Sequence, residues 1–493
     1  MSPEARSPQE AILQFLTSLQ SPARILVAIS GGSDSTGLLL LLDEAVKAAP
    51  HLKISLCAAT VDHALRAGSA DEAHAVAALC TSRGIPHTIP TWQGDKPKTG
   101  IMAAAREARY GLLAEAAEAL GADLIVTAHT LDDQRETLAM RGMRTEQVST
   151  GIADAVLFNR HFWVLRPLLF SSRADIRTFL SERGVPWIDD PSNEDVKYER
   201  VRIRRRLSTD AGPEKNIPRA WEDRLALSAK AADWLDRHFR LHGGLLGQVM
   251  PDGLRQDRAV LDYALGRLTA VFGGQPFAPG RAHMERLLSF ASGSQPGRMT
   301  AGRVVFDLRR DGLYLTRESR GILPLVLRPG EAGVWDGRFE AINGSGTTVK
   351  IEGQAAARSS LIPVLGPDPR DVTGIQPPRV GAVNDLTTHE ESPAPKDLGA
   401  LDSCDEHRNE GGWGAGLPKA AWKRAIASAP VLSADGTILS QESAPTIDLT
   451  PYFAPFDRFL TRFDFIFADR LSAVFATAPY PRPPLRSIDG KTI

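Results

Sequence analysis

Hydrophobic and polar positions in the first two hundred residues follow two alternating patterns. Short β-branched or apolar runs predict strands, and the longer Ala-, Leu- and Glu-rich stretches between them predict helices. The predicted strands cover residues 25–30, 53–63, 87–92, 123–129 and 162–169. The predicted helices cover residues 69–84, 100–120, 172–184 and a Leu-rich stretch that ends near Pro50. Strands that alternate with helices indicate a parallel sheet with helices on both faces.

The pattern changes after about residue 211. Apolar residues at helical spacing over 212–292, such as Trp221 with Leu225 and Leu261 with Leu265, predict a small helical domain. Residues 302–319 alternate around an Asp-Gly pair, which predicts a hairpin. Short strands from about Val326 predict a β-rich region, but residues 353–416 are too polar and too rich in Pro and Gly to order themselves.

These patterns predict three domains. We expect an α/β domain over 1–210, a mainly helical domain with a hairpin over 211–322, and a β-rich C-terminal domain over 323–493. We expect a disordered insertion near 353–416 within the last domain.

Composition narrows the class of protein. The 493 residues are 43% hydrophobic and 24% charged, which is enough apolar material for folded cores. The net charge is only -1, so a nucleic-acid partner must be met by a local basic patch. The 3 cysteines have no paired spacing, which favours a reducing compartment, and no apolar run is long enough to span a membrane. We therefore expect a cytoplasmic protein with no membrane partner.

The strongest chemical signal follows the first predicted strand and opens the next helix. It consists of Ser30, Gly31, Gly32, Ser33, Asp34 and Ser35. The glycines let the backbone approach a phosphate, and the helix N-terminus and serine hydroxyls supply donors. Asp34 can hold Mg²⁺ against the same phosphates. Ordinary helix caps in a Gly-Ser turn are the alternative, but the strand before and the helix after favour a phosphate-binding loop.

A second polar segment, residues 128–137, follows the strand predicted at 123–129. Open α/β sheets bind ligands at this end of their strands, so His129 is placed where a substrate binds. A helix that begins near Leu131 brings Asp133 and Glu136 to one face, because they lie three positions apart. Taken alone, acids favoured by the helix dipole explain the same pattern better than a functional site does.

A basic stretch near residue 200 is the candidate nucleic-acid contact. Its arginines are Arg200, Arg202, Arg204, Arg205 and Arg206. Each cation that neutralises a backbone phosphate adds affinity through counterion release. A solvated helix face is the ordinary alternative for such a run.

Several of these segments resemble known families. The S-G-G-x-D-S loop resembles the pyrophosphate-binding loop of the N-type ATP pyrophosphatases, and residues 129–137 resemble the HHxDDQxET motif of the tRNA(Ile)-lysidine synthetase family. The stretches 62–66, 103–110, 166–173 and 189–200 resemble further motifs of that family in the same order. Thr130 replaces the second His of the motif, and Val201 stands where the family usually has Asn.

This resemblance implies a Rossmann-like N-type ATP pyrophosphatase domain over 1–210, a tRNA-binding role for the mainly helical domain over 211–322, and a ligase that uses ATP and Mg²⁺. The implied partners are free L-lysine and an isoleucine tRNA with a CAU anticodon, and a homodimer is left open. Asp34, Asp133, Glu136 and His129 are the implied catalytic residues. Arg106 and Arg109 are candidates for contacts to substrate or phosphate, although an exposed helix face explains them equally well.

Three alternatives remain at this point. A tRNA-thiolating relative needs a reactive cysteine, and Cys57, Cys80 and Cys404 are poorly placed for that role. An ammonia-dependent ligase does not need the long C-terminal extension. A non-catalytic tRNA-binding protein would not need to retain the loop at residues 30–35 together with Asp133 and Glu136.

Overall fold

The computed structural model describes residues 5–64, 68–94, 96–97, 99–143, 149–188, 202–203, 216–355, 417–439, 446–488 and 491–492. These residues divide into two compact units. Unit 1 comprises Met1–Arg237, Gln256–Arg267 and Ala454–Ile493, and unit 2 comprises His238–Arg255 and Leu268–Phe453. No described helix combines the length and apolar composition of a membrane span.

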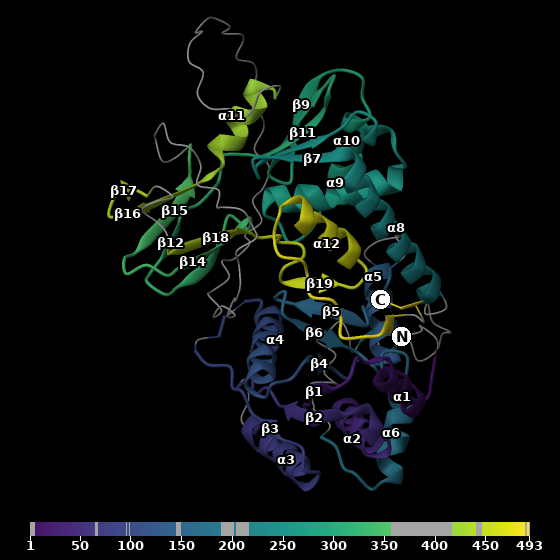
Figure 1. Ribbon diagram of the computed structural model, residues 1–493. Helices are drawn as coiled ribbons and strands as arrows, with labels where there is room; N and C mark the ends of the chain where they lie inside the picture. The colour runs from purple at the N-terminus through teal and green to yellow at the C-terminus, as the bar shows by residue number, and fades with distance from the viewer. Residues whose placement is uncertain are drawn as a thin grey trace, which may run out of the picture. The chain divides into compact units, whose positions relative to one another are not determined.

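Unit 1 is built on a seven-stranded sheet with the order β19-β5-β6-β4-β1-β2-β3 (Figure 1). Strands β1, β2, β3, β4 and β6 pair in parallel, whereas β5 and β19 pair antiparallel at one edge. The strands are β1 (Ala23–Ala28), β2 (Ile54–Ala59), β3 (His87–Thr88), β4 (Leu124–Val126), β5 (Ala155–Phe158), β6 (Phe162–Leu165) and β19 (Phe459–Thr461). The α/β prediction is confirmed, but the sheet is mixed and mostly parallel rather than wholly parallel.

Helices cover both faces of this sheet. Helix α4 packs on one face against Leu26, Cys57 and Ile125, while α1, α2 and α6 lie together on the other (Figure 1). The described helices of unit 1 are α1 (Pro8–Ser18), α2 (Ser33–Ala48), α3 (Ser69–Ser82), α4 (Ile101–Ala119), α5 (Leu131–Gly142), α6 (Arg173–Glu182), most of α8 (Ile217–His238), the first part of α9 (Arg258–Gly273) and α12 (Phe465–Val474). The turns that follow β1 and β4 lead directly into α2 and α5, which brings both candidate segments to the carboxyl ends of adjacent strands.

The C-terminal segment, residues 454–493, belongs to unit 1. Strand β19 pairs with β5, and the Arg462 guanidinium forms a buried ion pair with Asp154 at 3.0 Å. The sequence predicted that this segment belongs to a β-rich C-terminal domain, whereas the structure groups it with unit 1. The physical reason is long-range strand pairing, which local patterns along the chain do not encode.

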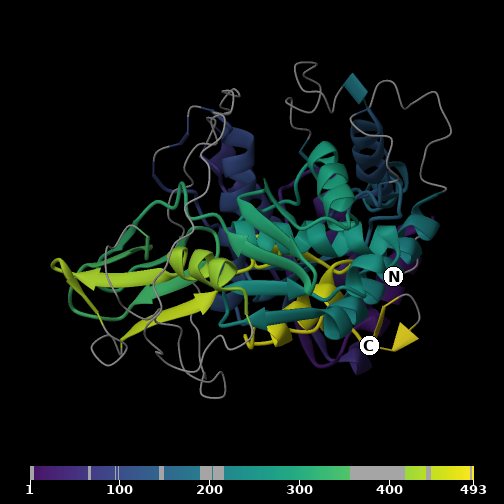
Figure 2. The same cartoon turned by 90° about the horizontal axis from the view of Figure 1, so that it is seen from above.

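The described part of unit 2 contains three sheets and the helices that cover them. A five-stranded sheet has the order β7-β8-β11-β10-β9, and smaller sheets have the orders β12-β15-β16-β17 and β13-β14-β18. The strands are β7 (Phe239–His242), β8 (Leu246–Val249), β9 (Gly297–Ala301), β10 (Val304–Arg309), β11 (Gly312–Arg317), β12 (Leu325–Leu327), β13 (Ala332–Trp335), β14 (Phe339–Asn343), β15 (Val349–Gly353), β16 (Pro430–Ala434), β17 (Thr437–Ile438) and β18 (Ile447–Pro451). The helices are the end of α9 (Arg258–Gly273), α10 (Arg281–Ala291) and α11 (Lys419–Ala427), and α11 packs beside β11 and β8 (Figure 2).

The predicted hairpin over 302–319 is confirmed, because β10 and β11 pair across a turn at Arg310 and Asp311. The region predicted as helical also contains the β7–β8 hairpin, whose short strands interrupt the helical pattern. The expected insertion near 353–416 lies outside the described residues apart from its first three positions.

Candidate active site

The glycine loop between β1 and α2 requires a glycine at Gly31. Its φ angle is +83°, a left-handed conformation that side chains rarely adopt. A Cβ atom at this position would lie 2.8 Å from Cδ1 of Ile188 and 3.1 Å from Cγ2 of Val76. The Gly31 carbonyl also accepts a hydrogen bond of 2.9 Å from the Ile188 N–H. Residues after α6 therefore hold this turn in place.

The rest of the loop presents a helix N-terminus without a side-chain cap. Gly32 is the N-cap of α2 and makes no capping side-chain hydrogen bond. The Ser35 hydroxyl accepts from the Ser30 N–H and lies close enough to donate to the Gly32 carbonyl, both at 3.1 Å. Ser33 donates to Oδ1 of Asp34 at 3.2 Å. Such an N-terminus, with hydroxyls beside it, is suited to an anion.

Helix α5 begins at Leu131, as the sequence predicts, and Asp133 forms part of its cap. Oδ2 of Asp133 accepts hydrogen bonds from the Thr130 N–H at 2.9 Å and from the Thr130 hydroxyl at 3.1 Å. Oδ2 of Asp133 is therefore used by the helix cap, which the sequence analysis did not predict. Glu136 is 1% exposed, and the half-buried His129 has its Nδ1 3.0 Å from the Thr127 hydroxyl.

Arg173 joins the two candidate segments. This first residue of α6 donates from Nε to Oδ2 of Asp34 at 2.8 Å, and its Nη2 lies 3.7 Å from Oδ1 of Asp133. Its backbone N–H donates to Asp132 at 2.9 Å. Burial raises the pKa of Asp34 above its ordinary value. The positive charge of Arg173 lowers this pKa and the negative charge of Asp133 raises it, and the pKa remains raised overall. The contacts thus bring Asp34 and Asp133 together around one guanidinium.

Arg106 and Arg109 lie around Tyr110 of α4. The Arg106 guanidinium is 5.2 Å from the centre of the Tyr110 ring, and Nη2 of the buried Arg166 donates to the Tyr110 hydroxyl at 3.3 Å. Burial alone would raise the pKa of Tyr110, but Arg166, Arg106 and Arg109 outweigh it and lower this pKa to about 8. Arg106 is exposed and Arg109 is half-buried, and with Arg166, which follows β6, they place three cations around the Tyr110 side chain.

The basic stretch near residue 200 is only partly described. Arg202 is exposed, whereas Arg200, Arg204, Arg205 and Arg206 lie outside the described residues.

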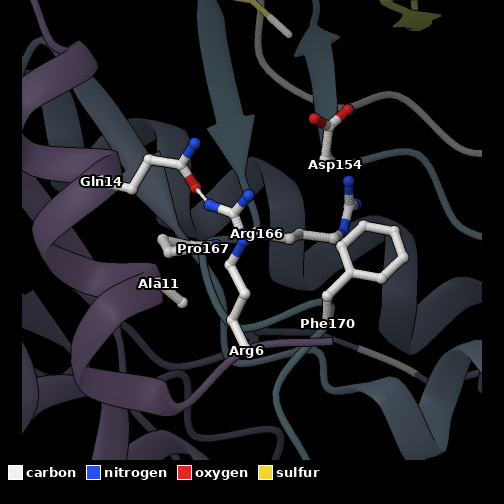
Figure 3. Close-up of a pocket in the computed structure, with 7 residues that line it drawn as sticks. All are labelled: Arg6, Ala11, Gln14, Asp154, Arg166, Pro167 and Phe170. Atoms are coloured by element: carbon white, nitrogen blue, oxygen red, sulfur yellow. Dashed lines mark hydrogen bonds between the residues drawn. The ribbon is translucent and has the colours of Figure 1, made fainter. Parts of the chain in front are cut away.

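A small cavity lies at the end of β6 in unit 1. Arg6, Gln14, Arg166 and Asp154 point toward it, and Arg6 hydrogen-bonds Gln14 (Figure 3). Its volume of about 10 Å³ is enough for about one water molecule and too small for a nucleotide. The cavity is therefore a packing feature beside the sheet.

Comparison with known proteins identifies the family to which the chain belongs. Residues 5–211 match the model of the PP-loop domain. The chain is 40% identical over 487 residues to the tRNA(Ile)-lysidine synthase of Rhizobium meliloti (strain 1021), which covers 96% of both chains. The chain belongs to the tRNA(Ile)-lysidine synthase family. The tRNA(Ile)-lysidine synthase of Mesorhizobium japonicum is 42% identical, and the match covers 64% of this chain and 71% of that enzyme. The tRNA(Ile)-lysidine synthase of Brucella melitensis biotype 2 is 35% identical, and the match covers 71% of this chain and 80% of that enzyme.

The sequence alone assigned no role to Arg173 or Tyr110 of this member of the tRNA(Ile)-lysidine synthase family. Both lie in segments that resemble family motifs, at 166–173 and 103–110. Their partners, however, lie on elements that are distant in the sequence: Asp34 for Arg173 and Arg166 for Tyr110. A basic residue at the start of a helix that follows a strand end was the one local signal for Arg173.

The residues around Asp34 fit Mg²⁺ only together with substrate phosphates. Mg²⁺ prefers oxygen ligands and is usually bound by one or two carboxylates plus phosphate oxygens and water. Asp34 and Asp133 provide such carboxylates on either side of Arg173. No group of three or more His, Cys, Asp or Glu side chains suited to a metal occurs among the described residues. A phosphate-bearing substrate would thus have to complete the coordination.

Proposed function

We propose that the chain is an ATP-dependent tRNA(Ile)-lysidine synthase. It joins free L-lysine to C2 of the wobble cytidine in the isoleucine tRNA with a CAU anticodon, which changes the codon read from AUG to AUA. The observation that carries this proposal is 40% identity to a relative of that name over 96% of both chains. We place the reaction in the cytoplasm, and the free, buried thiols of Cys57 and Cys80 are compatible with a reducing compartment.

The first step makes a leaving group. Cytosine O2 attacks the α-phosphorus of ATP, the bond from that phosphorus to the bridging oxygen breaks, and pyrophosphate departs with the electron pair. The loop from Ser30 to Ser35 would bind the phosphate tail at the N-terminus of α2. Asp34 would hold Mg²⁺, which when bound neutralises charge that develops on the pyrophosphate.

The second step replaces that leaving group. The ε-amine of lysine attacks C2, AMP departs with the former O2 atom, and the ammonium must first lose a proton to become nucleophilic. We assign proton removal to Glu136, which is buried and shielded from water, and substrate positioning to Asp133, whose Oδ2 is held in the α5 cap. His129 contacts the adenylated intermediate in this scheme, and Arg106 and Arg109 contact substrate or phosphate.

The alternatives are less well supported. Thiolation needs a reactive thiolate, but burial raises the pKa of Cys57 and raises that of Cys80 to about 11, which makes both poor nucleophiles. Cys404 lies outside the described residues. A non-catalytic tRNA-binding protein would not need the left-handed Gly31 or the Asp34–Arg173–Asp133 arrangement.

Incorporation of labelled lysine into tRNA tests this function. We expect ATP-dependent lysine transfer to an isoleucine tRNA transcript with a CAU anticodon and none to the same transcript with GAU. Transfer of sulfur instead would support thiolation, and tRNA binding without ATP consumption would support the non-catalytic protein. Either result would overturn the proposal.

Gly31→Ala is expected to reduce ATP affinity by about tenfold or more, with Gly32→Ala as its matched control. The added Cβ at Gly31 meets Ile188 at 2.8 Å in a left-handed conformation, a strain of roughly 1–3 kcal/mol. At Gly32 the closest atom would be 3.8 Å away, and φ is -69°. Isothermal titration with a non-hydrolysable ATP analogue measures both. Equal affinities of the two variants would contradict the proposed loop geometry.

Replacing Arg204, Arg205 and Arg206 together by alanine is expected to weaken tRNA binding and flatten its salt dependence. Each lost phosphate contact lowers the slope of log K against log salt by about 0.9 for a duplex and about 0.7 for a single strand. Filter binding between about 50 and 200 mM salt measures this slope. An unchanged slope would remove these arginines from the interface.

A further inference from the structure

Two arginines of α6 reach two consecutive side chains of the glycine loop. Arg173 donates from Nε to Asp34 at 2.8 Å, and Arg177 donates from Nε to the Ser33 hydroxyl at 3.2 Å. The two arginines lie four positions apart, so they share one face of the helix. Both guanidiniums therefore contact the first turn of α2, where the loop would bind phosphate.

We propose that Arg173 and Arg177 bind the β- and γ-phosphates of ATP and hold the pyrophosphate after the α-phosphorus bond breaks. This inference rests on the proposed function, because it requires the loop to bind a triphosphate. Guanidinium groups are the side chains best matched to phosphate, with which they form paired charge-assisted hydrogen bonds.

The contacts leave Arg173 free to take this role. It is 18% exposed, and only its Nε and backbone N–H donate hydrogen bonds among the described residues. Nη2 is 3.7 Å from Asp133, beyond hydrogen-bond distance. The terminal nitrogens of the guanidinium are therefore available to phosphate oxygens while Nε stays on Asp34.

The negative charges near the loop favour a cation at this position. Asp34 and Asp133 bring two carboxylates close to the place where a polyanionic phosphate tail would bind. Like charges at short range repel, and a cation between them offsets that repulsion. Arg173 lies between both carboxylates, and Arg177 adds a second positive charge on the side of Ser33.

A purely structural role for Arg173 is the competing explanation, since α2 and α6 pack together. Arg183, at the C-cap of the same helix, supplies a matched control. It also connects α6 to α2, through hydrogen bonds of 2.7 and 2.9 Å to Glu44, but at the end of α2 opposite the loop. Loss of Arg183 removes an ion pair between the same two helices without touching the candidate phosphate site.

Calorimetric titration of the full chain with inorganic pyrophosphate in Mg²⁺ buffer, and separately with AMP, tests the proposal. We expect Arg173→Gln to weaken pyrophosphate binding by about tenfold or more, the worth of a charge-assisted hydrogen bond. Arg177→Gln should cause a smaller loss because this side chain is exposed, and Arg183→Gln should cause none. Affinity for AMP should stay unchanged in all three variants, and Arg173→Lys should recover part of the pyrophosphate affinity.

Two results would overturn the proposal while the proposed function stands. These are unchanged pyrophosphate affinity in Arg173→Gln, and a parallel loss of AMP and pyrophosphate affinity, which would mean that the loop itself is disturbed. A wild-type protein that binds neither ATP nor pyrophosphate would instead overturn the proposed function itself.

Discussion

Replacing Asp34 by alanine is expected to abolish adenylation of the tRNA while tRNA affinity remains nearly unchanged. Asp34 is placed to hold Mg²⁺ at the first turn of α2, and its carboxylate organises the guanidinium of Arg173. Loss of a preorganised electrostatic contact of this kind costs about 10²–10³-fold in rate. Single-turnover release of pyrophosphate and filter binding of tRNA measure the two quantities separately.

Asp43 provides the control, because it is an acid on the same helix with its own ion pairs. Asp43 contacts Lys47 at 2.7 Å and Arg83 at 3.4 Å. We expect Asp43→Asn to lower thermal stability with little change in the adenylation rate per folded molecule, and Asp34→Asn to show the reverse. Loss of tRNA binding with normal pyrophosphate release in Asp34→Ala would contradict the role of this residue.

Arg462→Ala is expected to lower the free energy of unfolding of unit 1 by about 3–5 kcal/mol. The Arg462 and Asp154 side chains are 3% and 2% exposed, so the truncation removes a guanidinium that forms an ion pair with a buried carboxylate. Arg462 also donates its backbone N–H to the Ala155 carbonyl beside β19, at 3.1 Å. Urea unfolding followed by tryptophan fluorescence measures the change.

Two further variants make this test specific. Arg470→Ala removes a surface pair with Asp236, at 49% and 43% exposure, and should change stability by no more than about 1 kcal/mol. Asp154→Leu combined with Arg462→Met removes both buried charges and should recover most of the lost stability. Equal effects of Arg462→Ala and Arg470→Ala would show that the C-terminal segment does not stabilise unit 1.

Local chemistry explains what could be predicted from the sequence. The loop from Ser30 to Ser35 and the start of α5 at Leu131 depend on neighbouring residues: a strand, a left-handed glycine and a helix cap. The Asp-Gly turn between β10 and β11 is equally local. Such features are determined by residues within a few positions of one another in the sequence.

Long-range pairing explains what could not be predicted. Strand β19 joins β5 across some three hundred positions, and no pattern in residues 454–493 specifies that partner. The approach of Arg173 to Asp34 and Asp133 likewise depends on how α6 packs beside α2. The candidate acids were therefore visible in the sequence, whereas the contact of Arg173 with both of them was not.

Transfer of label from ATP to tRNA in the absence of lysine tests adenylation at the glycine loop directly. We predict that α-³²P-labelled ATP labels an isoleucine tRNA transcript with a CAU anticodon, that γ-labelled ATP does not, and that lysine then releases the label as AMP. Label from the γ position, or none from either position in a protein that binds the tRNA, would contradict adenylation at the glycine loop.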